Sequence, residues 1–184
     1  MTCNRISYSK EPHLLYYCNI HPEAKVCYHA SDMILYIHSD TSYNSEARAQ
    51  SRAGGHFYLG NNASVRPTMH NNGSILNTST IMLNVMAFAS KAECGALFKN
   101  TKEAVALRTT IKKMGHPQPP TTVKVDNSTA VGFANKQIKQ QKSKSMDMRY
   151  YCIQDCVAQK HFQVYWRPGL TNLGDYLTKH FPPS

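Results

Sequence analysis

Four acidic residues stand at the ends of separate segments of this chain, and their placement points to metal chemistry. Asp40 closes the run ILYIHSD, Glu93 lies in SKAEC, Asp126 closes TVKVD and Asp175 lies in NLGDY. Bringing carboxylates within about 4 Å of one another costs on the order of 4 kcal/mol per pair at an effective dielectric constant near 20. Mg²⁺ ions remove this cost, because hard cations bind carboxylate oxygens and hold phosphate groups. Two ions roughly 4 Å apart can activate a water on one side of a phosphorus atom and stabilise the leaving oxygen on the other.

Each acid also has an ordinary structural interpretation. Asp175 follows the N-cap candidate Asn172 within the first turn of a predicted helix, where the helix dipole favours an acid by roughly 0.3–1 kcal/mol. Asp126 could belong to a turn or a helix cap, and Glu93 could be an exposed helical acid paired with a lysine. Each of these interpretations is the simpler one for a single acid. The four together favour a metal site, because they converge only if the strands and helices pack as the element order requires.

The order of predicted elements indicates an α/β domain with a mixed sheet. The predicted strands cover about 33–40, 56–59, 74–80, 122–126 and 162–166, and the predicted helices cover 89–114, 128–134, a segment around Tyr150, Ile153 and Val157, and a last segment from Asn172 to Pro182. Three strands joined by short polar connections predict an antiparallel meander, and the later strands return parallel through helical crossovers. In such sheets sites form beyond the carboxyl ends of central strands, where Asp40 and Asp126 lie.

Two elements have a clear apolar pattern. Ala104, Leu107, Ile111 and Met114 recur at helical spacing and predict one apolar stripe on the helix 89–114. Gly115 and the prolines that follow it end this helix. In the strand 162–166, Phe162, Val164 and Trp166 alternate with polar neighbours, which predicts one buried face.

The chain is basic, and the charge is concentrated. The formal net charge is +10, with Lys99, Lys102, Arg108, Lys112, Lys113, Lys124, Lys136, Lys139, Lys142 and Lys144 clustered against Glu103 and Asp126. Such a field favours a polyanionic partner, although a basic surface that serves only solubility stays open as the alternative. No apolar run is long enough to span a bilayer and the polar start does not resemble a signal peptide, so we expect a non-secreted protein without a membrane partner and with reduced cysteines.

Residues 1–31 are rich in tyrosine, cysteine and histidine and show no clean period, so we interpret them as an extension before a domain that covers 32–184. Cys18, His21, Cys27 and His29 invite a zinc interpretation. Their spacing fits no common structural zinc site, and packed or exposed side chains are the favoured interpretation.

The chain resembles the ribonuclease H domain of copia-type retrotransposon polyproteins, over a region from about Tyr16 to Pro182. The motifs that carry the resemblance are Ser39-Asp-Thr-Ser-Tyr43, Ser51-Arg-Ala-Gly-Gly-His-Phe-Tyr-Leu59, Ala92-Glu-Cys-Gly-Ala-Leu97, Val125-Asp-Asn127, Lys144-Ser-Met-Asp-Met-Arg-Tyr150 and Asn172-Leu-Gly-Asp-Tyr-Leu-Thr-Lys179. The resemblance implies a ribonuclease H-like fold with a five-stranded mixed sheet flanked by helices. It further implies hydrolysis of the RNA strand of RNA–DNA hybrids with two Mg²⁺ ions, with Mn²⁺ as a substitute, during reverse transcription.

By position, the resemblance assigns the metal-binding and catalytic roles to Asp40, Glu93, Asp126 and Asp175. It makes residues 1–31 the remnant of a connection to an upstream reverse transcriptase domain, and it places the protein in the cytoplasm, within a virus-like particle, or in the nucleus. Phosphate contacts are expected from the nucleic-acid-binding candidates Asn127, Lys136, Lys139, Lys142, Lys144 and Arg149. The chain departs from the family at Lys91, where an acid is common, and at Gly174, where alanine is usual; the glycine should loosen the last helix by up to about 1 kcal/mol.

Three other functions compete with the nuclease. An integrase-type polynucleotidyl transferase shares the fold but needs a glutamate about 35 residues after the second aspartate, and that position holds His161. A nucleic-acid-binding fragment with weak or no catalysis is the main alternative, because a copy of a mobile element can decay. A purely structural tether would leave the four acids unexplained.

Overall fold

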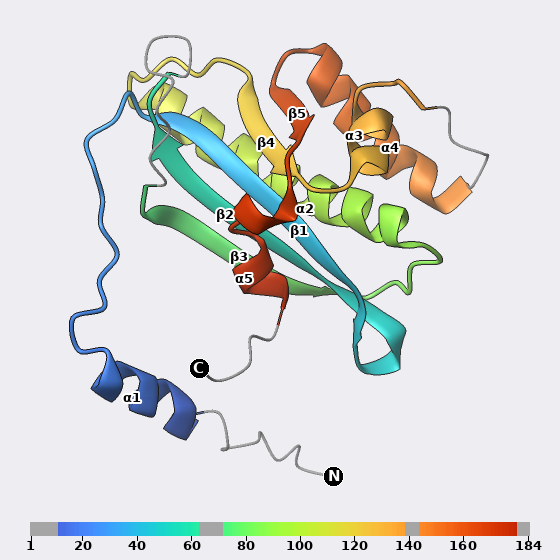
Figure 1. The fold of residues 1–184 in the computed structure, drawn as a ribbon. Coiled ribbons are helices and arrows are strands. Elements are labelled where there is room, and N and C mark those ends of the chain that lie inside the picture. Colours follow the sequence, from blue (N-terminus) through green and yellow to red (C-terminus); the bar gives the residue numbers. More distant parts are fainter. Residues whose placement is uncertain (1–10, 63–71, 139–143, 180–184) are drawn as a thin grey trace, which may run out of the picture.

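The computed structural model describes residues 11–62, 72–138 and 144–179 (Figure 1). The helices are α1 (Glu11–Ile20), α2 (Ala89–Lys113), α3 (Ser128–Ala134), α4 (Lys144–Ala158) and α5 (Asp175–Thr178), with 3₁₀ turns at Ala47–Ala49 and Gly169–Thr171. The strands are β1 (Ile34–Glu46), β2 (Gln50–Gly60), β3 (Ser74–Met82), β4 (Thr121–Val125) and β5 (Phe162–Trp166). None of the helices in these ranges is long and apolar enough to cross a membrane.

The five strands form one mixed sheet in the order β3-β2-β1-β4-β5. β1 pairs antiparallel with β2, and β2 with β3, whereas β1 with β4 and β4 with β5 are parallel. The predicted fold class, a mixed sheet with an antiparallel meander followed by parallel strands and flanking helices, is therefore confirmed.

Successive residues of β1 point to opposite faces of the sheet, and each face has its own cover. On one face Ser39 accepts a hydrogen bond from the Asn100 side chain of α2, at 2.9 Å. On the other face Asp40 accepts one from Thr178 of α5. Figure 1 shows this layering, with α2 behind the sheet and the short α5 in front of it.

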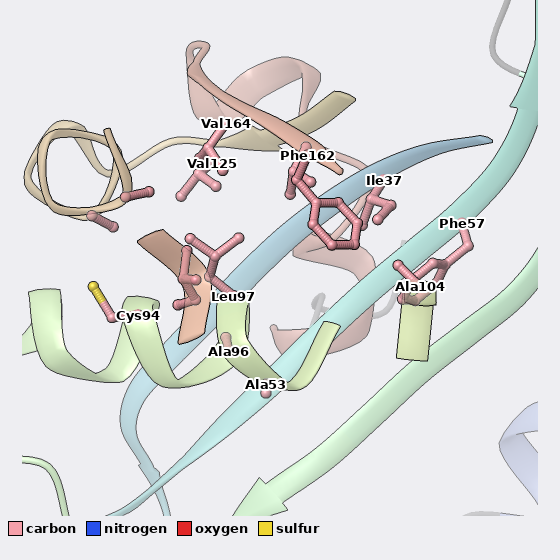
Figure 2. Packing of buried hydrophobic residues seen from close by; sticks show 14 of the residues in the cluster. Ile37, Ala53, Phe57, Cys94, Ala96, Leu97, Ala104, Val125, Phe162 and Val164 are labelled. Carbon is pink, nitrogen blue, oxygen red and sulfur yellow. The ribbon is translucent and has the colours of Figure 1, made fainter. Parts of the chain in front are cut away.

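The main core lies between the sheet and α2. Leu35, Phe57, Leu97 and Val123 are fully buried there, and Figure 2 shows aliphatic and aromatic side chains of the strands facing α2. Burial of this apolar surface supplies the main favourable contribution to folding, at roughly 25 cal/mol per Å². The sheet and α2 therefore form a packed base for the residues that β1 and β4 carry.

Two glycines in the middle of β2 let both layers approach the strand. A Cβ atom on Gly55 would overlap the Asn100 amide of α2, and one on Gly54 would lie 2.5 Å from Thr178 Cγ2 and 2.9 Å from the carbonyl oxygen of Gly174. Gly54 and Gly55 were expected to precede a strand that starts near His56. They lie inside it instead, because close approach of other segments requires residues without side chains.

Four further expectations were wrong in detail. The strand expected to end at Asp40 continues to Glu46, because its pairing with β2 extends beyond Asp40, so Asp40 lies inside β1. Met114 does not continue the buried stripe of α2 and is 64% exposed, since it follows the end of the helix. Trp166 is 50% exposed, because β5 is an edge strand and this residue is its last. The last helix does not begin at Asn172 and covers only Asp175–Thr178, while the predicted end at Pro182 lies outside the described residues.

The extension contains a helix that the sequence pattern did not indicate. Every side chain described in α1, from Leu15 to Ile20, is exposed, whereas residues 27–29 are attached to the sheet. The amide of Asn72 donates to the His29 carbonyl oxygen at 2.9 Å and accepts from the His29 N–H at 2.8 Å. The Gly73 N–H also donates to the Cys27 carbonyl oxygen at 2.9 Å, and the Tyr28 hydroxyl donates to the Ser74 carbonyl oxygen at 2.9 Å, so residues 27–29 are tied to the start of β3.

Candidate metal centre

The register between β1 and β4 brings Asp40 and Asp126 together. The two strands are parallel, and His38 pairs with Lys124. Two residues further along each strand, the same face of the sheet carries Asp40 and Asp126. This follows from the two-residue period of strands, so the meeting of these two carboxylates is set by the sheet itself.

The segment between β5 and α5 carries Asp175 to the same place. The Asn172 side chain donates to the Ser39 carbonyl oxygen at 3.0 Å and accepts from the Gly174 N–H at 3.1 Å. The Leu173 N–H donates to His38 Nδ1 at 3.0 Å. These bonds dock the segment on β1, so that α5 begins directly beside Asp40.

Gly174 is required by this docking. A Cβ atom there would lie 2.9 Å from the Cβ atom of Asp40 and 3.1 Å from its backbone nitrogen. Backbone neighbours at this distance cannot move aside without displacing the segment. The glycine that was expected only to loosen the last helix therefore has a packing role beside Asp40.

The three aspartates form a compact cluster. Asp40, Asp126 and Asp175 each have one carboxylate oxygen in the cluster, and these three oxygens lie within 4.8 Å of one another. In the described ranges this is the only group of three or more acids, histidines or cysteines close enough to share a metal ion. Cys18, His21, Cys27 and His29 form no such group, and none of the described cysteines forms a disulfide.

Glu93 approaches the cluster from the other layer without belonging to the compact group of three. It lies in the first turns of α2 and is 7% exposed. Close to it, Thr41 of β1 donates to the Ala92 carbonyl oxygen at 3.5 Å, a weak contact that links the start of α2 to the end of the buried part of β1. Glu93 is near enough to Asp40 for the charge of Asp40 to raise the pKa of Glu93.

Burial and mutual repulsion raise the pKa values of these carboxyls. Burial, followed by the negative charge of Asp40, raises the pKa of Glu93 to about 9. Burial raises the pKa of Asp40 to about 6; Thr178 opposes this rise by hydrogen bonding, and Asp175 and Asp126 add to it. The pKa of Asp126 is also raised, by burial and then by Asp175.

Lysine side chains balance part of this charge. Lys179 Nζ contacts Asp175 Oδ2 at 2.7 Å, across one turn of helix. Burial lowers the pKa of Lys179, but the hydrogen bond to Asp175 and the charges of the other acids outweigh burial and raise it. Lys124 also acts on Asp126 and Asp175, but two lysines still leave an excess of carboxylates among the four acids, which is the condition that a divalent cation relieves.

The donor set fits a hard divalent cation. Glu93 Oε2 and Asp175 Oδ1 are buried and have no hydrogen-bond partner in the part of the chain that the structure describes. Leaving a buried acceptor unpaired costs roughly 1–3 kcal/mol, and more for a charged group. Carboxylate oxygens are the ligands that Mg²⁺ prefers. Asp40, Asp126 and Asp175 could therefore hold such an ion, with Glu93 beside them.

Comparison with solved structures places this geometry in a known fold. The chain is similar to the ribonuclease H1 LC11, isolated from compost by a metagenomic approach, with a TM-score of 0.57, 13% identity, and coverage of 79% of this chain and 93% of the other. The ribonuclease H1 of the halophilic archaeon Halobacterium salinarum gives a TM-score of 0.54, 12% identity, and coverage of 79% and 94%. The chain has a ribonuclease H-like fold. LC11 in complex with an RNA/DNA hybrid also matches, with a TM-score of 0.55, 12% identity, and coverage of 79% and 92%.

No protein-family model matches the sequence of this ribonuclease H-like chain, and no curated protein matches it. The likeness therefore rests on the arrangement of the elements in space. At sequence identities of 12–13%, this structural likeness shows the fold alone, and the chemistry of the site has to be argued from its own residues.

The nucleic-acid-binding candidates are only partly described. Asn127 is the N-cap of α3, with its side chain accepting from the Ala130 N–H at 3.0 Å, so its oxygen already has a structural role. Lys136 is exposed just after α3. The Arg149 guanidinium lies 6.0 Å from the Phe98 ring centroid, beside α2. Lys139 and Lys142 lie outside the described residues, as does the side chain of Lys144.

Sequence reasoning missed the residues that orient the cluster. Thr178 and Lys179 contact Asp40 and Asp175, His38 holds the Leu173 N–H, and buried Lys124 donates to Thr171 Oγ1 at 2.6 Å instead of joining the basic surface. The i to i+4 spacing of Asp175 and Lys179 was a usable signal. The other contacts join residues far apart in the chain, and no local pattern shows them.

Proposed function

We propose that this chain is a ribonuclease H, which hydrolyses the RNA strand of RNA–DNA hybrids with two Mg²⁺ ions. The observation that carries the proposal is the meeting of Asp40, Asp126 and Asp175 within 4.8 Å, where the end of β4 and the start of α5 lie beside β1 of a ribonuclease H-like sheet. Mn²⁺ is the substitute metal, because it accepts the same oxygen ligands. When bound, the ions would supply an activated water and stabilise the leaving oxygen.

The residues of this chain would prepare the site in three ways. Asp40, Asp126 and Asp175, with Glu93 beside them, would hold the ions. Thr178 fixes one oxygen of Asp40 and leaves the other for a ligand. Asn172 and His38 hold the backbone next to Asp175, so the third carboxylate arrives with its position already set.

The broader setting belongs to the same proposal. Resemblance to copia-type polyproteins supports a role in reverse transcription, with an upstream reverse transcriptase domain as partner and residues 1–31 as the connection. Such a protein would act in cytoplasmic virus-like particles or in the nucleus. The hybrid-bound LC11 structure, which shares the fold, supports a hybrid as substrate.

Cleavage of a labelled RNA–DNA hybrid tests this function. We expect Mg²⁺-dependent cleavage of the RNA strand, no cleavage of a DNA duplex, and loss of cleavage in Asp126→Asn. Asp155→Asn is the matched control, because it removes the same charge from an exposed position on α4. Tight hybrid binding without cleavage by the unmodified chain would favour the non-catalytic fragment and overturn the nuclease.

A further inference from the structure

A basic groove lies away from the acidic cluster. It has a volume of about 700 Å³ and runs between the carboxyl-terminal half of α2 and the turn from α4 to β5. Arg108, Lys112 and Lys113 line it from α2, and Lys160 and His161 line it from the turn. In the described parts of the chain no acidic residue lines the groove.

The walls of this groove are fixed by hydrogen bonds. Arg108 donates to the Gln118 carbonyl oxygen at 2.7 Å and to Thr121 Oγ1 at 2.8 Å, so its positive charge is held in the wall. Opposite it, the His161 N–H donates to the Cys156 carbonyl oxygen at 2.9 Å and closes the end of α4. The groove is therefore built from anchored backbone.

The lysines of the groove have charges available for a ligand. Lys112, Lys113 and Lys160 are exposed, and none of them forms an ion pair with another described residue. The nearby acid Asp155 accepts a hydrogen bond from the Gln159 amide at 2.7 Å and does not line the groove. Like charges gathered without counter-charges are unfavourable unless an anion joins them.

The helix dipole explains only part of this cluster. Lys112 and Lys113 lie in the last turn of α2, where cations are favoured by roughly 0.3–1 kcal/mol. Lys160 and His161 belong to a different segment and still face the same groove. The helix dipole does not explain why basic side chains from two separate elements line the same groove.

The groove is separate from the proposed cleavage site. Thr121, at the start of β4, pairs with Phe162 directly after the groove residue His161, whereas Asp126 follows the other end of β4. Five strand residues at about 3.3 Å each place the groove about 16 Å or more from the acids. Figure 1 shows the carboxyl-terminal ends of α2 and α4 at the same end of the sheet.

We propose that this groove binds the phosphates of a nucleic-acid strand outside the cleavage site. Its lining offers ammonium groups and the polar side chains Thr109 and Gln159, which suit phosphate oxygens. Val105 is the only aliphatic residue among those described in the lining, and an acidic peptide is the alternative ligand that the binding experiment distinguishes from nucleic acid. The site does not require catalysis and stands apart from the proposed hydrolysis.

Binding of a labelled single-stranded RNA to the full chain, in EDTA and over a series of salt concentrations, tests this groove. We expect Lys112→Ala with Lys160→Ala to weaken binding and to flatten the slope of log K against log salt by about 0.7 per lost phosphate contact, hence about 1.4 in all. Lys25→Ala with Lys102→Ala removes the same charge from exposed positions outside the groove and should leave the slope near that of the parent chain.

Equal effects of the two double variants would overturn the proposal, because the overall charge would then explain the binding. No effect of the groove variant would overturn the proposal as well. Binding of polyglutamate that depends on the groove lysines, in the absence of any RNA binding, would overturn it too. Thermal unfolding confirms that each variant is folded. Because cleavage is not measured, failure of the nuclease proposal would leave this result unchanged.

Discussion

The carboxyl group of Glu93 is buried beside other acids, where its charged form is unfavourable. Its pKa is raised from 4.5 to about 9, first by burial and then by Asp40. Without metal, the folded state binds this proton more tightly than the unfolded state does. The free energy of unfolding should therefore fall as pH rises from about 4.5 to about 9.

Thermal unfolding in EDTA across this pH range measures the effect. Glu93→Gln cannot ionise, so its stability should depend less on pH than that of the parent chain. Saturating Mg²⁺ should also weaken the fall in stability, because bound ions favour the ionised carboxylates in the folded state. Identical pH profiles for the parent chain and Glu93→Gln would show that Glu93 is not buried beside the cluster.

His38 is expected to position Asp175 without touching the metal. Burial, then the charge of Lys124, lowers the pKa of His38 to about 3, so its neutral ring can accept from the Leu173 N–H. His38→Leu removes this acceptor at a cost of roughly 1–3 kcal/mol and should weaken Mg²⁺ binding. His38→Gln keeps an acceptor and should restore part of the affinity.

The single tryptophan provides the measurement for His38. Trp166 Nε1 donates to the Asp126 carbonyl oxygen at 2.9 Å, so its fluorescence should report a Mg²⁺ titration. Equal Mg²⁺ affinity in His38→Leu and the parent chain would exclude the positioning role. A loss of stability alone would leave His38 as a core residue with no part in the site.

At the scale of elements, the position of the segment from β5 to α5 depends on its close contact with β1 more than on the helix propensity of its residues. Alanine at position 174 would favour a helix by about 1 kcal/mol, yet its Cβ atom would lie 2.9 Å from that of Asp40. We expect Gly174→Ala to lower stability and Mg²⁺ affinity together. Thermal unfolding and the fluorescence titration test both effects.

Gly132→Ala in α3 is the matched control for this substitution. Its Cβ atom would lie 2.5 Å and 2.9 Å from Cδ1 and Cγ1 of Ile138, which are side-chain atoms at the end of the described segment after α3, and would meet no backbone atom of another element. This variant should be neutral or slightly stabilising. If Gly174→Ala behaved in the same way, the close docking of the segment on β1 would be wrong.

The sequence revealed those features of the elements that depend on local pattern. β-Branched and alternating residues located the strands, helical spacing located α2, and the bounds of α3 were predicted correctly. The end of β4 before Asp126 was also predicted correctly, whereas the predicted strand end at Asp40 was wrong, because β1 stays paired with β2 beyond Asp40 and continues to Glu46. The short α5 did not follow, since Asn172 bonds to Ser39 across 133 positions instead of capping a helix.

At the scale of the whole molecule, the domain is expected to stand without its extension. The side chains described from Leu15 to Ile20 in α1 are exposed, and residues 27–29 are joined to the start of β3 by a few hydrogen bonds. A chain that starts at residue 32 should fold, with a modest loss of stability, and should bind Mg²⁺ as the full chain does. An unfolded or metal-insensitive product, judged by circular dichroism and fluorescence, would place the boundary elsewhere.

The sheet, the docked C-terminal segment and the first turns of α2 bring acids from separate parts of the chain into one cluster. Anomalous diffraction from crystals soaked in Mn²⁺ tests this cluster most directly. We predict at least one Mn²⁺ peak within bonding distance of Asp40, Asp126 and Asp175, absent in crystals of Asp126→Asn. Crystals of the parent chain with no peak there at saturating Mn²⁺ would contradict the account.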